Sequence, residues 1–199
     1  MLNIKTFYFN PYRECTYVVD NGQGQCFIVD PGMYGENEEQ RMADYLAKSK
    51  HRPVAILITH SHPDHICGLD FFRHHYPTVP IFGLNYQMGL REFDAGKSDA
   101  FTEAEEVFTH NNFPSPLVIR TPGHKEDSVC YYFDKEKVLF TGDTLFQESV
   151  GRTDLEGGDT ALLLQSLHRL MELPDDTTVY PGHAYPTTIA HEKQFNPFL

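Results

Sequence analysis

The sequence lacks the features that mark nucleic-acid-binding, secreted or membrane proteins. It has no block of lysine and arginine, and its formal net charge is −12. Because phosphate binding needs basic side chains gathered on one face, a nucleic-acid partner is not expected. The first residues carry no apolar signal core, and no apolar stretch is long enough to cross a bilayer. We therefore expect a soluble cytoplasmic protein with no membrane partner.

Cysteine is scarce, and the cysteines that occur are scattered. Cys15, Cys26, Cys67 and Cys130 form no CxxC pair, which favours reduced cytoplasmic thiols over a disulfide framework. The chain also lacks low-complexity segments, long linkers and internal repeats. Its 199 residues and its 40% hydrophobic content predict a single folded domain, residues 1–199, with one sizeable core. The sequence predicts no particular oligomeric state.

Short apolar runs separated by turn signals predict a mixed α/β fold. Strands are predicted at residues 5–9, 15–19, 26–29, 54–58, 80–82, 117–120, 129–133, 138–141 and 178–180. Helices are predicted at residues 38–48, 69–75, 160–171 and 187–195. Because both halves of the chain mix strands and helices in a similar way, we expect two sheets faced by helices. The polar stretch 86–116 shows no clear core strand, and whether it closes over a substrate stays open.

The residues with the most chemistry form a run of seven, Thr-His-Ser-His-Pro-Asp-His, at positions 59–65. The run follows an apolar strand candidate and contains four potential metal ligands: His60, His62, Asp64 and His65. Neutral imidazole and carboxylate groups suit zinc, and they also suit iron or manganese. A polar loop of helix-capping residues is the alternative interpretation of this run.

The spacing within the run predicts two directions for its side chains. His60 and His62 are two residues apart, so an extended backbone points both rings to the same side. Pro63 suits the first turn of a helix, and Asp64 and His65 then point in a neighbouring direction. Four ligands that diverge in this way indicate parts of two adjacent metal positions.

Further ligands are expected at the ends of other strands, because residues 60–65 alone would leave a metal site incomplete. Three candidates follow strand-like runs and stand beside a glycine, at loops where the backbone can approach a metal: His124, Asp143 and His183. A lone loop histidine is usually a surface group, and an aspartate there is often a turn residue. Each of the three residues is therefore a convincing metal ligand only together with the rest of the set.

In this order, the motif HxHxDH at 60–65 and the three later residues resemble the metallo-β-lactamase superfamily. The resemblance implies a four-layer αββα sandwich with a binuclear centre at one edge of its two mixed sheets. It assigns the ligands of one metal to His60, His62 and His124. It assigns the second metal to Asp64, His65 and His183, with Asp143 as the bridge. The implied cofactors are two divalent ions, zinc first, with iron or manganese as alternatives.

Further motifs indicate which branches of this family the sequence resembles most. Residues 141–146 (TGDTLF) and 151–154 (GRTD) resemble the glyoxalase II-like and persulfide-dioxygenase-like branches, and residues 181–188 (PGHAYPTT) resemble single-domain glyoxalase II-like hydrolases. Those hydrolases cleave thioesters such as S-lactoylglutathione. The resemblance therefore implies a small-molecule thioester or thiol-derived substrate, attacked by a hydroxide that the metals activate. Asp64 and Asp143 are the candidate catalytic carboxylates, which offset the metal charge and accept a proton.

Other residues near these motifs have a functional and a structural interpretation. Arg152 is a candidate for orienting a substrate carboxylate, with a structural ion pair as the alternative. Phe146 and Tyr185 are candidates for lining the pocket, with packing as the alternative. Asp30 is expected to be a turn or supporting residue and not a ligand. Cys67 is expected to be a small residue packed behind the site.

Three other functions compete with thioester hydrolysis. The first is a persulfide dioxygenase with a single iron held by His60, His124 and Asp143. The second is hydrolysis of lactones or other esters by the same fold, and the third is a non-enzymatic metal-binding scaffold. The intact ligand set argues against the scaffold. The acidity argues against a nuclease, and the lack of a secretion signal argues against β-lactam hydrolysis.

Overall fold

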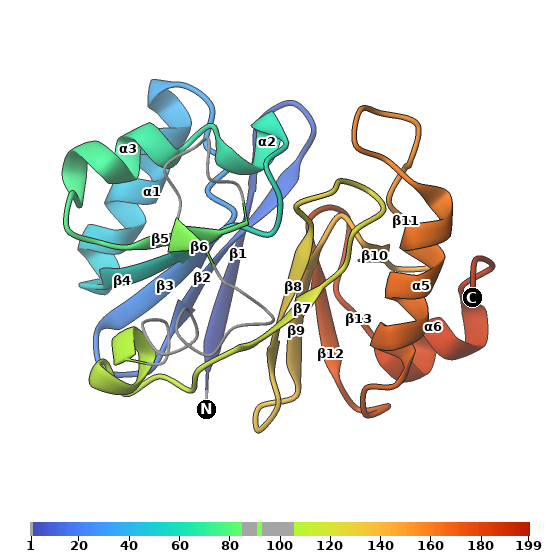
Figure 1. Ribbon diagram of the computed structural model, residues 1–199. Coiled ribbons are helices and arrows are strands. Elements are labelled where there is room, and N and C mark those ends of the chain that lie inside the picture. Colours follow the sequence, from blue (N-terminus) through green and yellow to red (C-terminus); the bar gives the residue numbers. More distant parts are fainter. Residues whose placement is uncertain (1, 85–90, 93–105) are drawn as a thin grey trace. The chain divides into compact units, whose positions relative to one another are not determined.

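The computed structural model describes residues 2–84, 91–92 and 106–199 (Figure 1). The chain forms two compact units, the first from residues 1–58 and 62–115 and the second from residues 59–61 and 116–199. Each unit is a mixed sheet with helices packed on it. The ligand run 59–65 therefore begins in the second unit and continues in the first. The single domain predicted from length stays a prediction.

The first unit contains a six-stranded sheet in the order β1-β2-β3-β4-β5-β6. Its strands are β1 (Asn3–Phe9), β2 (Glu14–Asp20), β3 (Gln25–Val29), β4 (Arg52–Leu57), β5 (Ile81–Gly83) and β6 (Arg91–Glu92). The helices are α1 (Glu36–Ser49), α2 (Pro63–Ile66) and α3 (Leu69–His75). The first three strands are antiparallel neighbours, and the later neighbours are parallel. Because β3 and β4 are parallel, the loops that follow them leave the sheet at the same edge.

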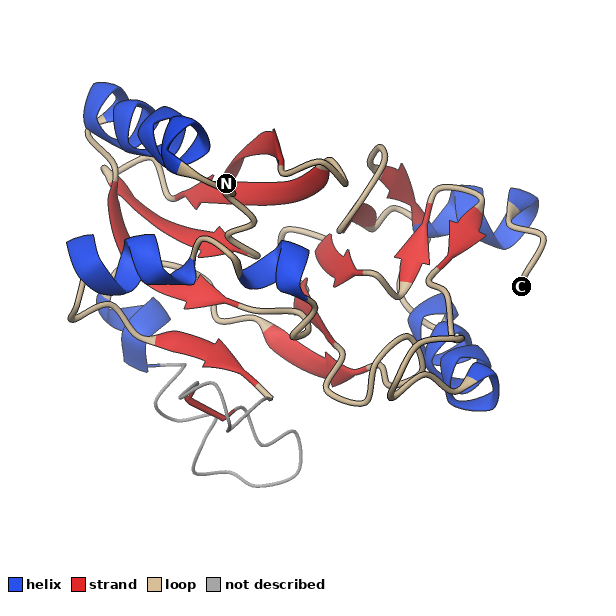
Figure 2. Ribbon diagram, turned by 90° about the horizontal axis from the view of Figure 1, so that it is seen from above, coloured by secondary structure: helices blue, strands red, loops and turns tan. Residues whose placement is uncertain are grey.

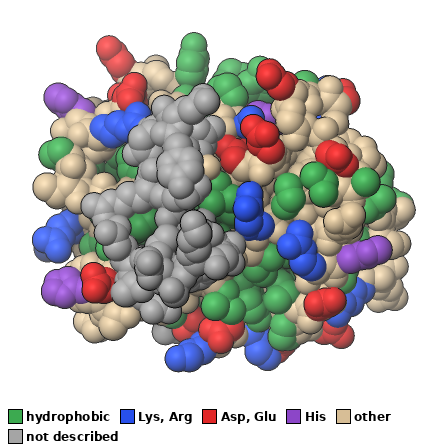
Figure 3. Space-filling view, viewed as in Figure 1, with side chains coloured by type: hydrophobic (Ala, Val, Ile, Leu, Met, Phe, Trp, Pro, Cys, Tyr) green, Lys and Arg blue, Asp and Glu red, His purple; other side chains and the backbone are tan. Residues whose placement is uncertain are grey.

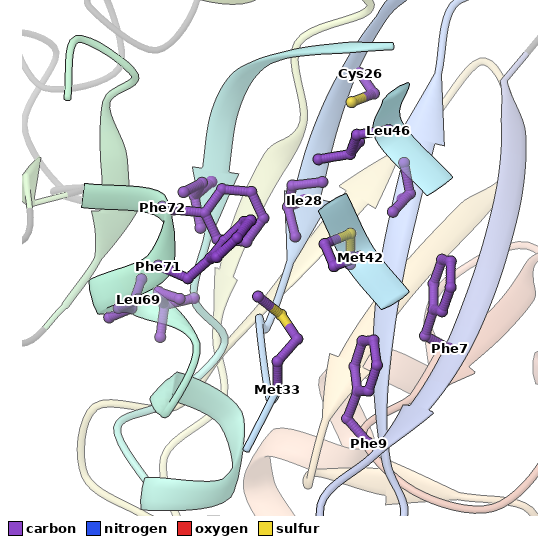
Figure 4. Close-up of a cluster of buried hydrophobic side chains, with 13 residues drawn as sticks. Phe7, Phe9, Cys26, Ile28, Met33, Met42, Leu46, Leu69, Phe71 and Phe72 are labelled. Atoms are coloured by element: carbon purple, nitrogen blue, oxygen red, sulfur yellow. The ribbon is translucent and has the colours of Figure 1, made fainter. Parts of the chain in front are cut away.

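The core of the first unit joins its sheet to helices α1 and α3 (Figure 4). Met42 and Leu46 lie about one turn apart on α1, and they share a buried cluster with Phe72 of α3 and Ile28 of β3. Burying a side chain of this size contributes about 1.5–3 kcal/mol. This core anchors α3, and α2 precedes α3 directly in the chain. The short helix that carries two predicted ligands is therefore attached to a well-packed element.

The second unit contains a five-stranded sheet in the order β13-β12-β9-β8-β7. Its strands are β7 (Leu117–Arg120), β8 (Val129–Phe133), β9 (Val138–Gly142), β12 (Thr178–Pro181) and β13 (Thr187–Thr188). A separate hairpin joins β10 (Leu145–Phe146) to β11 (Ser149–Val150), and the helices are α5 (Thr160–Met171) and α6 (Ile189–Phe195). Only β9 and β12 pair in parallel among the described strands of this sheet.

Helix α5 covers the second sheet with an apolar face. Leu163, Leu167 and Leu170 recur at helical spacing and share a buried cluster with Val179 of β12. The carboxylate of Asp159 caps the helix by accepting a hydrogen bond from the Leu162 amide at 3.0 Å. Figure 2 shows helices beside the strands of each unit. The helix predicted at 160–171 from this spacing is confirmed.

The structure corrects two predictions about the elements. Residues 106–110 are helical, and Phe108 is fully buried with its ring 5.4 Å from that of Phe27. The polar stretch 86–116, for which no helix was predicted, therefore contains one at this point. A single buried aromatic residue gave too little periodicity for the sequence to indicate it. Residues 187–188 form β13, so the last helix begins two residues later than predicted. Whether the stretch 86–116 closes over a substrate depends mainly on residues 85–90 and 93–105, which lie outside the described residues.

Charged side chains of both signs are mixed on the face drawn in Figure 3, with apolar side chains between them. Within the described ranges, no helix is both long enough and apolar enough to cross a bilayer. The four cysteines are all free thiols in the structure.

Candidate metal centre

In the first unit, α2 brings Asp64 and His65 together. His62 caps this helix with an extended backbone, and Pro63 occupies its first turn. The His65 ring is fully buried, and its Nε2 atom lies 3.8 Å from Oδ2 of Asp64. The Nδ1 atom of His65 lies 2.9 Å from Oδ2 of Asp30, at the end of β3. A carboxylate in this position orients the imidazole and directs Nε2 toward a metal.

In the second unit, four predicted ligands converge from four separate loops: His60, His124, Asp143 and His183. The rings of His60 and His124 lie 4.9 Å apart, between centroids. Oδ2 of Asp143 lies 3.6 Å from Nε2 of His124 and 3.5 Å from Nε2 of His183. One carboxylate oxygen therefore serves two imidazoles, which is the arrangement that a bridging ligand requires.

Two of the imidazoles in the second unit, those of His124 and His60, are held through their Nδ1 atoms. Nδ1 of His124 lies 2.7 Å from the main-chain carbonyl oxygen of Arg152, and Nδ1 of His60 lies 3.1 Å from Oγ1 of Thr59. With a carbonyl as its partner, Nδ1 of His124 must carry the proton, so Nε2 is left as the ligand atom.

Close approaches at two glycines shape the loop that carries Asp143. Gly142 has a φ of 49°, and a Cβ there would collide with the side chain of Thr59. A Cβ on Gly151 would collide with the main-chain carbonyl of Asp143. Thr144 N donates a hydrogen bond to Thr141 O at 3.1 Å, which closes the turn. Glycine is thus required at position 142 for packing, next to the carboxylate of Asp143.

The donor set in each unit fits a divalent metal ion. Around tetrahedral zinc, with metal–ligand distances of about 2.0–2.1 Å, neighbouring ligand atoms lie about 3.3–3.4 Å apart. The three Nε2-to-Oδ2 distances of 3.5–3.8 Å are close to this spacing. Imidazole nitrogen and carboxylate oxygen are also the ligand types that zinc, iron and manganese share.

The candidate substrate residues differ in their surroundings. The ring of Phe146 lies edge-on to that of His183, with 6.2 Å between centroids. The guanidinium of Arg152 donates two hydrogen bonds to the exposed carboxylate of Asp154, at 2.6 and 2.8 Å, and this pairing lowers the pKa of Asp154 to about 2. Tyr185 is 65% exposed. Their roles toward a substrate stay predictions.

Sequence reasoning missed a buried polar group beneath the ligand loop of the first unit. The carboxyl of Glu14 is fully buried, and burial raises its pKa well above the usual range. Thr16 Oγ1 donates to Glu14 Oε2 at 2.8 Å and accepts from the Gly32 amide at 2.9 Å. The sequence contains no signal for this group, because Glu14 stands just before the strand predicted at 15–19 and a glutamate is rarely fully buried.

Cys67 has the packing role that its position predicted. Its thiol is half-buried and donates to Gly32 O at 3.2 Å. Burial raises the pKa of this thiol to about 11, so it is protonated at neutral pH.

The comparison with protein families decides the family. The model of the metallo-β-lactamase superfamily matches residues 13–183. The chain belongs to the metallo-β-lactamase superfamily. Among members of this superfamily, the probable metallo-hydrolase YqgX of Bacillus subtilis is 36% identical over 190 residues, covering 88% of this chain and 87% of the relative. A hydroxyacylglutathione hydrolase of Francisella tularensis subsp. novicida is 33% identical over 185 residues, covering 92% of this chain and 68% of the relative.

Solved structures of the superfamily share the fold. The B3 metallo-β-lactamase BLEG-1 has a TM-score of 0.80 and 33% identity, covering 98% of this chain and 99% of that one. TTHA1623 in a di-iron-bound form has a TM-score of 0.78 and 29% identity, with coverages of 98% and 100%. ETHE1 from Myxococcus xanthus has a TM-score of 0.75 and 28% identity, with coverages of 98% and 83%.

The predicted family and the predicted α/β class, with mixed sheets faced by helices, are thus confirmed. The superfamily is one of metal-dependent hydrolases. The histidine and aspartate clusters of this chain suit divalent metal ions. The family does not specify which metal this protein binds or which substrate it cleaves.

Proposed function

We propose that this protein is a binuclear metallohydrolase that cleaves small-molecule thioesters. The observation that carries the proposal is the position of Asp143, whose Oδ2 atom lies within 3.6 Å of Nε2 of both His124 and His183. A carboxylate between two imidazoles is suited to joining two cations. The likeness to a hydroxyacylglutathione hydrolase supports the thioester as substrate class.

The proposed ligand assignment follows the resemblance and the continuity of the chain at 60–65. One metal takes His60, His62 and His124, and the other takes Asp64, His65 and His183, with Asp143 as the bridge. We propose zinc for both positions because imidazole and carboxylate ligands suit it. The di-iron form of TTHA1623 supports iron as the alternative, and manganese shares the same ligand types.

The chain's own residues have defined tasks in this reaction. Water adds to the thioester carbonyl carbon, the carbon–sulfur bond breaks, and the thiol leaves with a proton. Bound metal ions would supply an activated water and polarise the carbonyl. Asp64 and Asp143 are the proposed acceptors of the proton that the water loses. Asp30 and the Arg152 carbonyl keep two imidazoles in fixed orientations throughout.

Metal analysis combined with a thioester assay tests the proposal. Protein purified without added metal is expected to carry two metal ions per chain and to hydrolyse S-lactoylglutathione. Asp64→Asn is expected to reduce the rate at least about 100-fold, beyond the 10–100-fold typical of supporting residues. The matched control is Asp70→Asn, an exposed aspartate that pairs with Arg73 on α3. Full activity of Asp64→Asn would exclude the binuclear mechanism.

The likeness to ETHE1 favours a persulfide dioxygenase as the second candidate. That reaction needs one iron, with His60, His124 and Asp143 as ligands. The Asp64→Asn variant therefore separates the two functions, because it should retain oxygen uptake with glutathione persulfide in a dioxygenase. One iron per chain with oxygen uptake, and no thioester cleavage, would establish the second candidate.

The same assay should include a β-lactam and a lactone. The structural likeness to a B3 metallo-β-lactamase makes the β-lactam a necessary comparison. We propose that the partner is a small molecule, with neither nucleic acid nor membrane involved. The four free thiols support the proposed cytoplasmic location, where glutathione and thioredoxin keep cysteines reduced.

A further inference from the structure

Helix α2 is too short to fix its own geometry. It contains four residues, Pro63–Ile66, and its amide donor His65 N reaches only as far as His62 O, at 3.1 Å. Nucleating a helical turn is unfavourable when no further turns follow, so its conformation must be imposed from outside. Two of the proposed metal ligands, Asp64 and His65, depend on those outside contacts.

The side-chain amide of Asn10 bridges α2 and the loop after β3, beside the hydrogen bonds that Cys67 and Gly68 donate to the same loop. Its Nδ2 atom donates to Asp64 O at 2.9 Å and to Gly32 O at 3.0 Å. Both amide hydrogens are used, and each acceptor is a main-chain carbonyl. Gly32 stands two residues after Asp30, whose carboxylate orients His65. The amide of Asn10 therefore fixes a ligand and the support of a second ligand relative to each other.

Asn10 is itself held rigidly in the turn between β1 and β2. Its φ of 50° lies in the left-handed region, which asparagine tolerates better than most residues. Its main-chain amide donates to both carboxylate oxygens of Glu38 at 2.8 and 3.1 Å, and its Oδ1 accepts from Tyr12 N at 3.0 Å. Glu38 also accepts from Tyr34 N at 2.8 Å. The amide is thus preorganised before α2 docks.

We propose that Asn10 is a positioning residue for the metal ligands on α2. This inference rests on the metal centre of the proposed function, though not on the substrate. The two carbonyl oxygens require two donors on one short side chain. Asparagine provides them, whereas aspartate has the same shape but would face both carbonyls with lone pairs. Loss of the amide removes the direct tie between the Asp64 carbonyl and the loop after Asp30, which loosens α2 and weakens metal binding by Asp64 and His65.

Titration of the metal-free full-length chain with Co²⁺, followed by visible absorption and by stoichiometry, tests the proposal. Asn10→Gly removes the amide and tolerates the positive φ, and Asn10→Asp keeps the shape without the donors. In both variants we expect one of the two Co²⁺ equivalents to bind about 10–100-fold more weakly, as for other residues that orient ligands. The altered equivalent should also show a changed visible spectrum.

The matched control is Asn112→Gly. Asn112 has a φ of 57° and donates to Gln23 Oε1 at 3.3 Å, so the substitution makes the same backbone change away from α2. It should leave both Co²⁺ affinities unchanged. Unchanged affinities in Asn10→Gly would overturn the inference, as would weakening in Asn10→Asp alone, because repulsion would then be the cause. Failure of both Asn10 variants to fold would also overturn it, since the amide would then serve the whole fold.

The result of the Co²⁺ titration does not depend on which reaction the protein catalyses. If the wild type hydrolyses no thioester, the Co²⁺ affinities of the variants still decide the role of Asn10. If the wild type binds a single Co²⁺, the binuclear proposal fails. The inference then stands only if the Asn10 variants weaken that single ion and Asn112→Gly does not.

Discussion

Single residues outside the proposed ligand set orient the proposed ligands. A main-chain carbonyl holds His124, a hydroxyl holds His60, and a carboxylate holds His65. These contacts select which ring nitrogen faces the ligand partners. The precision of the site therefore depends on loop backbone as much as on the ligand side chains.

Arg152 combines two separable roles, and its replacement by alanine separates them. Its carbonyl orients His124, whereas its guanidinium pairs with exposed Asp154. Arg152→Ala keeps the carbonyl, so we expect metal content to stay at the wild-type level. If the guanidinium binds a substrate carboxylate, KM should rise about tenfold, the effect of losing a contact of about 1.4 kcal/mol. Metal analysis and steady-state kinetics measure the two effects.

Asp154→Ala is the comparison variant. It frees the guanidinium from its partner, so a substrate role for Arg152 predicts an unchanged or lower KM. A loss of metal from Arg152→Ala would instead show that the side chain shapes the loop that holds His124.

The candidate ligands could be proposed from the sequence because side-chain type and spacing indicate metal-binding chemistry. The supports could not be predicted in the same way. The partner of His124 is a carbonyl, which every residue possesses, and Asn10 acts on Asp64 from 54 positions away in the chain. A single sequence contains no signal for such pairs until the fold brings them together.

At the level of elements, helix α6 is fastened to the β10–β11 hairpin by a buried carboxylate. Glu192 is fully buried and accepts hydrogen bonds from Glu148 N at 2.8 Å, Thr187 Oγ1 at 2.6 Å and Asn196 Nδ2 at 2.8 Å. The hairpin contains Phe146, which lies against His183. The last helix thus supports a loop beside the proposed site.

Glu192→Ala should destabilise the protein strongly. The substitution leaves three donors without their acceptor, and each such loss costs about 1–3 kcal/mol, so the sum is about 3–9 kcal/mol. Because single substitutions rarely cost more than about 5 kcal/mol, we expect a total of about 3–5 kcal/mol. Thermal unfolding should show Tm lower by about 10 °C for a chain of this size. Hydrogen exchange should show faster exchange at the amides of the hairpin.

His191→Ala provides the control for this helix. His191 pairs with Glu148 at 2.9 Å on the surface, and exposed pairs contribute about 0–1 kcal/mol. Equal destabilisation by both variants would mean that the buried carboxylate contributes no more to the attachment of α6 than the surface ion pair does.

Most elements were predictable because their apolar residues recur with a clear period. Helix α5 has three leucines at helical spacing, and its predicted bounds agree with the structure. The β10–β11 hairpin escaped prediction because each strand has two residues. The sequence predicts that Thr187 and Thr188 begin the last helix. In the structure both residues pair with β12, and Thr188 is the N-cap of α6.

At the scale of the whole molecule, the net charge of −12 opposes the approach of anions. Screening by salt weakens this long-range repulsion, because the Debye length falls from about 30 Å at 0.01 M to about 8 Å at 0.15 M. We therefore expect kcat/KM for an anionic thioester to rise about twofold to threefold over this range.

A neutral thioester, such as an N-acetylcysteamine ester, should show no comparable rise in kcat/KM under the same conditions. A fall with salt for the anionic substrate would show that a local positive field outweighs the net charge of the chain.

The brevity of α2 has a consequence for the order in which the protein matures. Its holding contacts come from Asn10 and from Pro31, whose carbonyl accepts a hydrogen bond from Gly68 N at 2.8 Å. Contacts between residues this distant in sequence form late, after chain entropy has been lost elsewhere. The candidate ligands on α2 are thus expected to reach their final positions only when the rest of the chain is nearly folded. We expect metal acquisition to complete folding in this protein, whereas in zinc fingers it initiates folding.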